Sequence, residues 1–197
     1  ENDNCNLPKS FYASSKIATE AMSHSYSLLY CIPTTIFRFF TVYGPWGRPD
    51  MALFKFTSSI LNNKKINVYN FGRMKRDFTF INDLVEAIFL LINKKPDKPE
   101  NRVQKIKNDS ISVAAPWRIV NIGNSEPIEL TKFISTLENI LCKKAKKKYV
   151  CLQPGDLIET YSDIKLLKSL TGFKPNTKLS DGIEQFVNWY KEYYKIK

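Results

Sequence analysis

The sequence has little of what a metal site or a disulfide framework requires. It contains one histidine, His24, and four cysteines, none of which belongs to a C-x-x-C pair. Zinc sites are built largely from clustered residues of these two types, so we expect no metal site. Scattered cysteines without a pairing motif are typical of a reducing compartment, and we therefore expect reduced thiols and a cytoplasmic protein.

Long apolar runs are also missing. The longest run, from Ala87 to Ile92, is far shorter than the about 20 apolar residues of a membrane-spanning helix. The first residues, Glu-Asn-Asp-Asn-Cys, have neither the basic start nor the apolar centre of a signal peptide. We expect no association with a membrane.

The 197-residue chain carries a formal net charge of +11, which raises the question of a nucleic-acid partner. The densest basic stretch, Lys143–Lys148, follows an expected amphipathic helix, where cations complement the helix dipole and face solvent. No nucleic-acid-binding motif is recognisable. We therefore expect no nucleic acid and favour a small phosphate-bearing ligand, which the same charge would attract.

Helical and strand-like patterns alternate along the chain. Helical spacing of apolar residues predicts helices over 12–30, 51–61, 130–141 and about 180–194, with a further helix capped by Asn82 or Asp83. Runs typical of strands occupy 34–43, 66–69, 77–81 and 118–122, and residues 96–117 form a polar loop. This alternation predicts an α/β fold with a parallel sheet. The helix after Asp83 is apolar on several faces, so we expect it to be buried between layers.

A Tyr-x-x-x-Lys spacing occurs twice, at Tyr12 to Lys16 and at Tyr161 to Lys165. Four residues is about one helical turn, so both side chains of such a pair share a helix face. An ammonium beside a phenol stabilises the phenolate, which could then accept a proton from a substrate hydroxyl. The spacing alone is weak because both residue types are abundant, and the structural alternative is a packed tyrosine beside a solvated lysine.

The residues around the first pair distinguish it from the second. Thr19-Glu20-Ala21 follows it, and five further stretches lie in order downstream: Phe37–Ala52, Lys75–Asp83, Val120–Asn124, Gln153–Asp156 and Phe186–Tyr190. Together these motifs resemble the extended short-chain dehydrogenase/reductase superfamily, and within it the NAD-dependent nucleotide-sugar epimerases that act on UDP-glucuronate. The resemblance covers nearly the whole chain and is least informative over residues 93–116.

The resemblance implies a cofactor site for NAD. Tyr12 matches the catalytic base of the family, and Lys16 matches the lysine that assists it and holds the nicotinamide ribose. Phe39 and Phe40 match positions beside the nicotinamide.

The resemblance also implies a substrate site for a UDP-sugar. Thr41 matches a position beside the sugar, where a hydroxyl can bind the carboxylate of a uronic acid, and Arg48 matches an arginine near the sugar and diphosphate. Arg76 matches an arginine on the diphosphate, and Asp156 matches a carboxylate on the uridine ribose. Val68 and Tyr69 match the positions that hold the uracil.

The implied fold is an incomplete Rossmann-type parallel-sheet domain with a mixed α/β nucleotide-sugar-binding region. We expect residues 1–43 and 77–123 to belong to the NAD-binding domain, and residues 44–76 and 124–197 to the nucleotide-sugar-binding region. No G-x-G-x-x-G occurs in the sequence. We therefore expect this chain to be the C-terminal part of such an enzyme and to be inactive by itself, because the phosphate-binding loop of the family precedes the tyrosine.

The implied reaction is inversion at C4 of UDP-glucuronate through a 4-keto intermediate, with NAD bound throughout, in a homodimer. Gln153 supports the acidic sugar, since galactose-type epimerases tend to carry an arginine there and glucuronate epimerases do not. The alternatives are a UDP-glucose 4-epimerase, a sugar-nucleotide dehydratase or decarboxylase, and a catalytically dead binding protein. A nucleic-acid binder dependent on the lysines is the remaining rival.

Overall fold

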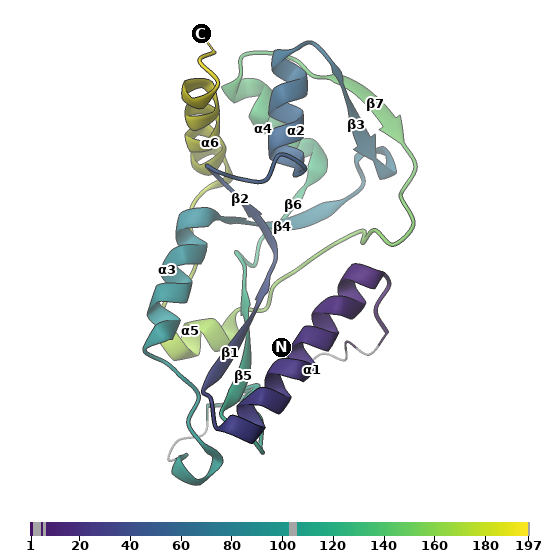
Figure 1. Ribbon diagram of the computed structural model, residues 1–197. Helices are drawn as coiled ribbons and strands as arrows, with labels where there is room; N and C mark the ends of the chain where they lie inside the picture. The colour runs from purple at the N-terminus through teal and green to yellow at the C-terminus, as the bar shows by residue number, and fades with distance from the viewer. Residues whose placement is uncertain (2–4, 6, 103–105, 197) are drawn as a thin grey trace. The chain divides into compact units, whose positions relative to one another are not determined.

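The computed structural model, drawn in Figure 1, describes residues 1, 5, 7–102 and 106–196. Its contacts divide the chain into two compact units. Unit 1 comprises Glu1–Phe39, Glu86–Ile122 and Asp163–Lys174. Unit 2 comprises Phe40–Val85, Gly123–Ser162 and Pro175–Lys197. The predicted division into a cofactor domain and a substrate region stays a prediction, because a division by contacts does not identify what either unit binds.

Unit 1 begins with the long helix α1, Phe11–Tyr30, which confirms the helix predicted over 12–30. The helix ends where Cys31 adopts a left-handed backbone with φ of 52°, two residues before Pro33. Ser27 is the buried residue of α1, and its Oγ donates a hydrogen bond of 2.8 Å to the carbonyl of Ile32. The helix therefore packs on one narrow side and leaves most of its circumference exposed.

Two parallel strands form the sheet of unit 1. β1, Thr34–Phe39, pairs with β5, Trp117–Ile122, in a register that runs from Thr34 opposite Trp117 to Phe39 opposite Ile122. The short helix α5, Lys165–Thr171, and the 3-10 turn η2, Pro99–Asn101, also lie in this unit. Parallel pairing places the carboxyl ends of both strands at one edge, which is the usual ligand edge of an α/β sheet.

The predicted strand over 34–43 is wrong as a single element, because the chain divides it at Phe40. The first part is β1, and the second is β2, Thr41–Tyr43, which pairs in parallel with β4, Lys75–Phe80. The two parts have different strand partners, so a local run of β-branched and aromatic residues could not reveal the break.

The described part of unit 2 contains two sheets and three whole helices, together with the first residues of the helix α3, which spans Ile81–Ile92. In one sheet β4 lies between its parallel partner β2 and the antiparallel strand β6, Pro127–Glu129. In the other, β3, Lys65–Tyr69, pairs in parallel with β7, Lys146–Val150. The helices are α2, Ala52–Leu61, α4, Leu130–Ile140, and α6, Leu179–Tyr193, and the 3-10 turn η1 spans Asn70–Gly72. The prediction of an α/β fold with parallel strand pairing is confirmed.

The core of unit 2 is aromatic. Phe78 of β4 stacks on Phe133 of α4 with ring centroids 4.4 Å apart and an interplanar angle of 11°. Phe186 of α6 is buried in the same cluster. Such offset stacks add to the free energy of apolar burial, so the helices are firmly held against β4.

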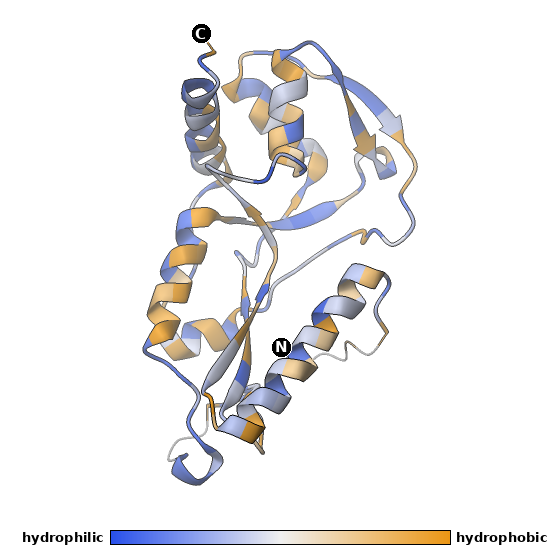
Figure 2. Cartoon of the chain, in the orientation of Figure 1, coloured by the Kyte–Doolittle hydropathy of each residue, from blue (hydrophilic) through white to orange (hydrophobic). Residues whose placement is uncertain are grey.

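The helix α3, Ile81–Ile92, differs from its prediction in two respects. Figure 2 shows apolar residues along most of it, yet Val85, Phe89 and Ile92 are exposed, so the expected burial between layers is wrong for the described chain. Its predicted cap is also wrong, because the helix begins at Ile81. The carboxylate of Asp83 instead accepts hydrogen bonds from the backbone N–H and the hydroxyl of Thr177, both at 2.9 Å.

None of the helices in the described residues combines the length and apolarity that a membrane crossing requires.

Candidate functional site

Tyr12 and Lys16 lie one turn apart on α1. The Nζ of Lys16 is 5.2 Å from the centroid of the Tyr12 ring, and both side chains are exposed, Tyr12 to 71%. The first turn of the helix is held by Ser10, whose Oγ accepts a hydrogen bond of 3.1 Å from the N–H of Ala13. The sequence pair is therefore a spatial pair, with a positive charge beside an accessible phenol.

The second copy of the spacing has no such geometry. Tyr161 lies in an irregular segment, and Lys165 is the first residue of α5. The Nζ of Lys165 donates a hydrogen bond of 2.9 Å to Asp163, and the hydrogen bonds from Lys165 hold the pKa of that carboxyl below its ordinary value. Helical context, rather than spacing, separates the two copies.

A bidentate ion pair ties α1 to the strand beside it. The Nε and Nη2 of Arg38 donate hydrogen bonds of 2.8 Å to the two carboxylate oxygens of Glu20. These hydrogen bonds raise the pKa of Arg38 further above its already high value. Glu20 lies one turn beyond Lys16, and Arg38 precedes Phe39, so the pair connects two parts of the predicted cofactor site.

Phe39 and Phe40 occupy the carboxyl end of β1 and the break before β2. The Phe39 side chain is 48% exposed and stacks on Phe37 with centroids 5.9 Å apart, whereas Phe40 is half-buried. An accessible ring at the carboxyl edge of parallel strands is positioned to contact a planar ligand.

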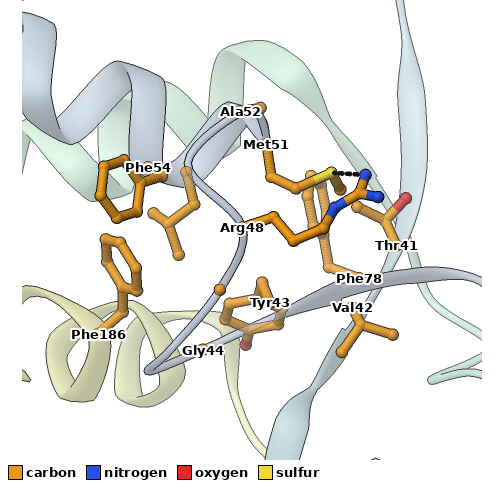
Figure 3. Close-up of a pocket in the computed structure, with 12 residues that line it drawn as sticks. Thr41, Val42, Tyr43, Gly44, Arg48, Met51, Ala52, Phe54, Phe78 and Phe186 are labelled. Carbon is orange, nitrogen blue, oxygen red and sulfur yellow. Dashed lines mark hydrogen bonds between the residues drawn. The ribbon is translucent and has the colours of Figure 1, made fainter.

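Thr41 and Arg48 line one pocket in unit 2 (Figure 3). The Nη2 of Arg48 donates a hydrogen bond of 3.4 Å to the sulfur of Met51, and Figure 3 shows the guanidinium on the same side of the pocket as Thr41. The cavity measures about 30 Å³, which is room for one or two water molecules. Arg48 is 73% exposed, so its contact with Asp50 at 3.3 Å contributes little to stability and leaves the arginine able to turn.

Arg76 and Asp156 form a loose ion pair. The Nη2 of Arg76 is 4.0 Å from the Oδ1 of Asp156, and its Nη1 donates hydrogen bonds to the carbonyls of Lys75 at 2.9 Å and Ile158 at 3.3 Å. The arginine side chain is only 22% exposed. Burial lowers the pKa of Arg76, and Asp156 offsets this in part. A desolvated cation with one distant carboxylate is suited to an additional anion.

The remaining predicted residues lie on β3. Tyr69 is half-buried, and its hydroxyl accepts a hydrogen bond of 3.3 Å from the Nε2 of Gln153. The backbone N–H of Asp156 in turn donates to the carbonyl of Gln153 at 3.1 Å. Val68 is 0% exposed, so the whole residue belongs to the core of unit 2.

The predicted residues divide between the two units, with Phe40 and the buried Val68 in unit 2. Tyr12, Lys16 and Phe39 lie in unit 1. Thr41 with Arg48, and Arg76 with Asp156 and Tyr69, are two groups in unit 2. Sequence reasoning missed the carboxylate of Asp77, which is fully buried next to Arg76. An acidic residue inside an aromatic strand was a usable signal, because aspartate is depleted in strands.

The chain is similar to known proteins over almost its whole length. A family model described as the NAD dependent epimerase/dehydratase family matches residues 1–106. Protein CapI of Staphylococcus aureus is 52% identical over 98% of this chain and 58% of its own length. A probable UDP-glucuronate 4-epimerase of Rhizobium meliloti is 47% identical over 99% of this chain and 57% of its own length.

A solved structure is similar along almost the whole chain. UDP-glucuronic acid 4-epimerase from Bacillus cereus, in complex with UDP-glucuronic acid and NAD, superimposes with a TM-score of 0.80 and 31% identity. The match covers 95% of this chain and 55% of that protein, so this chain spans little more than half the length of the relatives it matches. Because the family model matches more than half of its residues, the chain belongs to the NAD dependent epimerase/dehydratase family.

Proposed function

We propose that this chain forms part of a UDP-sugar 4-epimerase that acts on UDP-glucuronate. The observation that carries the proposal is the helical pair of Tyr12 and Lys16, with the ammonium 5.2 Å from the ring centroid on an exposed face. The names of the Rhizobium meliloti and Bacillus cereus relatives support the choice of reaction and sugar.

In this proposal Tyr12 is the general base. Its phenolate, stabilised by the charge of Lys16, accepts the proton of the sugar 4-hydroxyl and becomes a phenol, which returns the proton to the sugar oxygen after C4 has inverted. The family cofactor NAD would supply reversible oxidation of C4 when bound. The exposed Tyr12 and Lys16, with the exposed Phe39 at the carboxyl end of β1, fit such a group, and with Phe40 they are the residues of this chain that would hold it.

The nucleotide would bind to unit 2. Arg76 is half-buried and incompletely neutralised, and it would donate to the diphosphate, for which its planar guanidinium is well shaped. Asp156 would accept hydrogen bonds from the ribose hydroxyls. The half-buried ring of Tyr69 would contact the uracil, whereas Val68 lies in the core.

The sugar carboxylate would bind to Thr41 and Arg48. Both residues line the same pocket, and a hydroxyl with a guanidinium forms a donor set for a carboxylate. The described cavity is smaller than a hexuronate, so the exposed Arg48 side chain would have to turn outward as the sugar enters.

The test is substrate preference in a chimera that joins this chain to the part of the Bacillus cereus enzyme that it does not match. We expect kcat/KM to favour UDP-glucuronate over UDP-glucose by about 100-fold or more, because the sugar lacking the charge leaves polar groups unsatisfied. Equal turnover of both sugars would contradict the glucuronate assignment, and turnover of neither would contradict the epimerase assignment.

We further propose that the complete enzyme is a homodimer that pairs through α1. Met22, Tyr26 and Leu29 are exposed on this helix, and an apolar helix face of this kind is a candidate for helix packing with a second copy. Sedimentation of the chimera at micromolar concentration should give a dimer. A monomer would contradict the proposal.

A cytoplasmic location is also part of the proposal. The described cysteines form no disulfide, and Cys31, Cys142 and Cys151 are exposed thiols. This state is typical of a reducing compartment.

A further inference from the structure

Asp77 of β4 is 0% exposed. Its carboxylate is stabilised by hydrogen bonds from backbone N–H groups and from one hydroxyl. Its Oδ1 accepts a hydrogen bond of 2.8 Å from the N–H of Asn124. Its Oδ2 accepts bonds of 3.0 Å from the N–H groups of Ser125 and Ser162, and one of 2.5 Å from the Ser162 hydroxyl. Among the described residues, no lysine, arginine or histidine forms an ion pair with Asp77.

Local backbone conformation directs these donors at the carboxylate. Ser125 has a left-handed φ of 58°, so that the successive N–H groups of Asn124 and Ser125 converge on one anion. Gly123 precedes them, and a Cβ at that position would collide with the side chain of Ser162. A buried carboxylate is costly unless it is fully hydrogen-bonded, so this geometry fixes where the three segments meet.

One of the segments that Asp77 holds, residues 158–162, follows Asp156 closely in the chain. The backbone of Lys75 donates to Ile158 at 2.9 Å and accepts from Thr160 at 3.3 Å, and the N–H of Asp77 donates to the Thr160 hydroxyl at 3.1 Å. Residues 158–162 therefore run beside β4, and the hydrogen bonds from Ser162 to Asp77 hold the C-terminal end of this segment. At the near end, Arg76 donates to the carbonyl of Ile158 and lies 4.0 Å from Asp156.

We propose that Asp77 is the positioning residue of the nucleotide site. By holding residues 158–162 against β4, it sets the distance between Arg76 and Asp156, so that the guanidinium and the carboxylate face one nucleoside diphosphate. Asp77 itself does not contact the ligand, because its oxygens are occupied inside the protein. The inference rests on the proposed function and adds the residue that organises the site.

The test is the affinity of the 197-residue chain for UDP, measured by titration calorimetry. Asp77→Asn replaces an acceptor with a donor facing three N–H groups, and we expect UDP binding to weaken at least about tenfold. The matched control is Asp83→Asn, since Asp83 is also a buried aspartate of unit 2 that accepts three hydrogen bonds, here from Asn176 and Thr177. It should reduce stability without a change in UDP affinity.

A double-variant cycle separates positioning from general stability. If Asp77 acts through Arg76, then Asp77→Asn should add little further loss of UDP affinity in the background of Arg76→Ala. Additive losses, or equal losses for Asp77→Asn and Asp83→Asn, would overturn the inference.

A milder variant covers the case in which Asp77→Asn does not fold. Ser162→Ala keeps the carboxylate and removes one donor, and it should weaken UDP binding by about 3- to 10-fold while the circular dichroism stays native. Unchanged affinity in Ser162→Ala would then overturn the inference. Absence of UDP binding by the parent chain would overturn the nucleotide site as a whole, whereas binding that the variants leave intact would overturn only the role of Asp77.

Discussion

Arg38 donates two hydrogen bonds to Glu20, and the pair joins the strand that ends at Phe39 to the helix that carries Lys16. Both side chains are mostly buried, and their geometry is the parallel fork that guanidinium and carboxylate groups favour. The ion pair therefore helps to hold α1 against β1, and with it the helix turns that carry the tyrosine and the lysine.

Replacing Glu20 should test this coupling. Glu20→Gln leaves the charge of Arg38 partly buried without its carboxylate, so the free energy of unfolding should fall by about 1–3 kcal/mol. Urea denaturation measures the loss. Glu184→Gln, an exposed glutamate on α6, is the control and should have almost no effect. Similar losses in both variants would show that the fork has no special role.

Removal of the phenol at Tyr12 should abolish most of the proton transfer. In the chimera with the Bacillus cereus enzyme, Tyr12→Phe should lower kcat by about 100-fold or more, the usual scale for loss of a general base. Tyr161→Phe should leave kcat nearly unchanged, since Tyr161 lies outside a helix. A larger loss from Tyr161→Phe would mean that the wrong copy of the spacing has been assigned.

Thr41 should contribute to the choice of sugar. Thr41→Val keeps the shape of the side chain and removes the hydroxyl, so the preference for UDP-glucuronate over UDP-glucose should fall by about 1–2 kcal/mol, or 5- to 30-fold. The ratio of kcat/KM values for the two sugars measures this. Thr35→Val, at a half-buried strand position outside the pocket, should leave the ratio intact. A ratio unaffected by Thr41→Val would remove this residue from the site.

Glu138 should make the stability of unit 2 depend on pH. Burial raises the pKa of this carboxyl, but hydrogen bonds from Lys147 and the Ala145 N–H, with the charge of Lys144, outweigh burial and lower it overall. A lowered pKa means that the contribution of Glu138 is fully present above the ordinary value of 4.5 and is lost as the pH falls below it.

Comparison of Glu138→Gln with the parent chain isolates this contribution. The variant should be less stable by about 1–3 kcal/mol at pH 7, and the difference should shrink as the pH is lowered toward 3. Thermal unfolding across this range measures it, with Glu126→Gln, an exposed glutamate, as the control. A difference that is constant with pH would contradict the assignment.

The elements that could be predicted from the sequence are those whose pattern is local. The helix α1 and the helix α4 follow from apolar spacing, and β3 follows from its short apolar run. The strand β7 was not predicted, because its lysines are typical of a solvated tail and its strand character comes from pairing with β3, about 80 residues earlier.

The candidate site shows the same division. The pair of Tyr12 and Lys16 could be singled out by the motifs around it, and the other eight predicted residues came from the same family resemblance. The hydrogen bonds between Asp77 and Ser162 join positions 85 residues apart, and no local pattern encodes that meeting. The burial of Val68 could likewise not be predicted from the sequence, because it depends on which face of β3 the core covers.

The register of β3 and β7 has a consequence for the behaviour of the chain in concentrated solution. Lys65 lies opposite Lys146 and Asn67 opposite Lys148, so these side chains share a face and are exposed, while Lys147 is held by Glu138 on the other face. In the part of the chain that the structure describes, each of the two strands has one edge without a strand partner. Such an edge can recruit a strand from another molecule, and lysine is a side chain that natural sheets use to oppose this. Part of the +11 charge therefore repels neighbouring copies of the chain and protects it from aggregation.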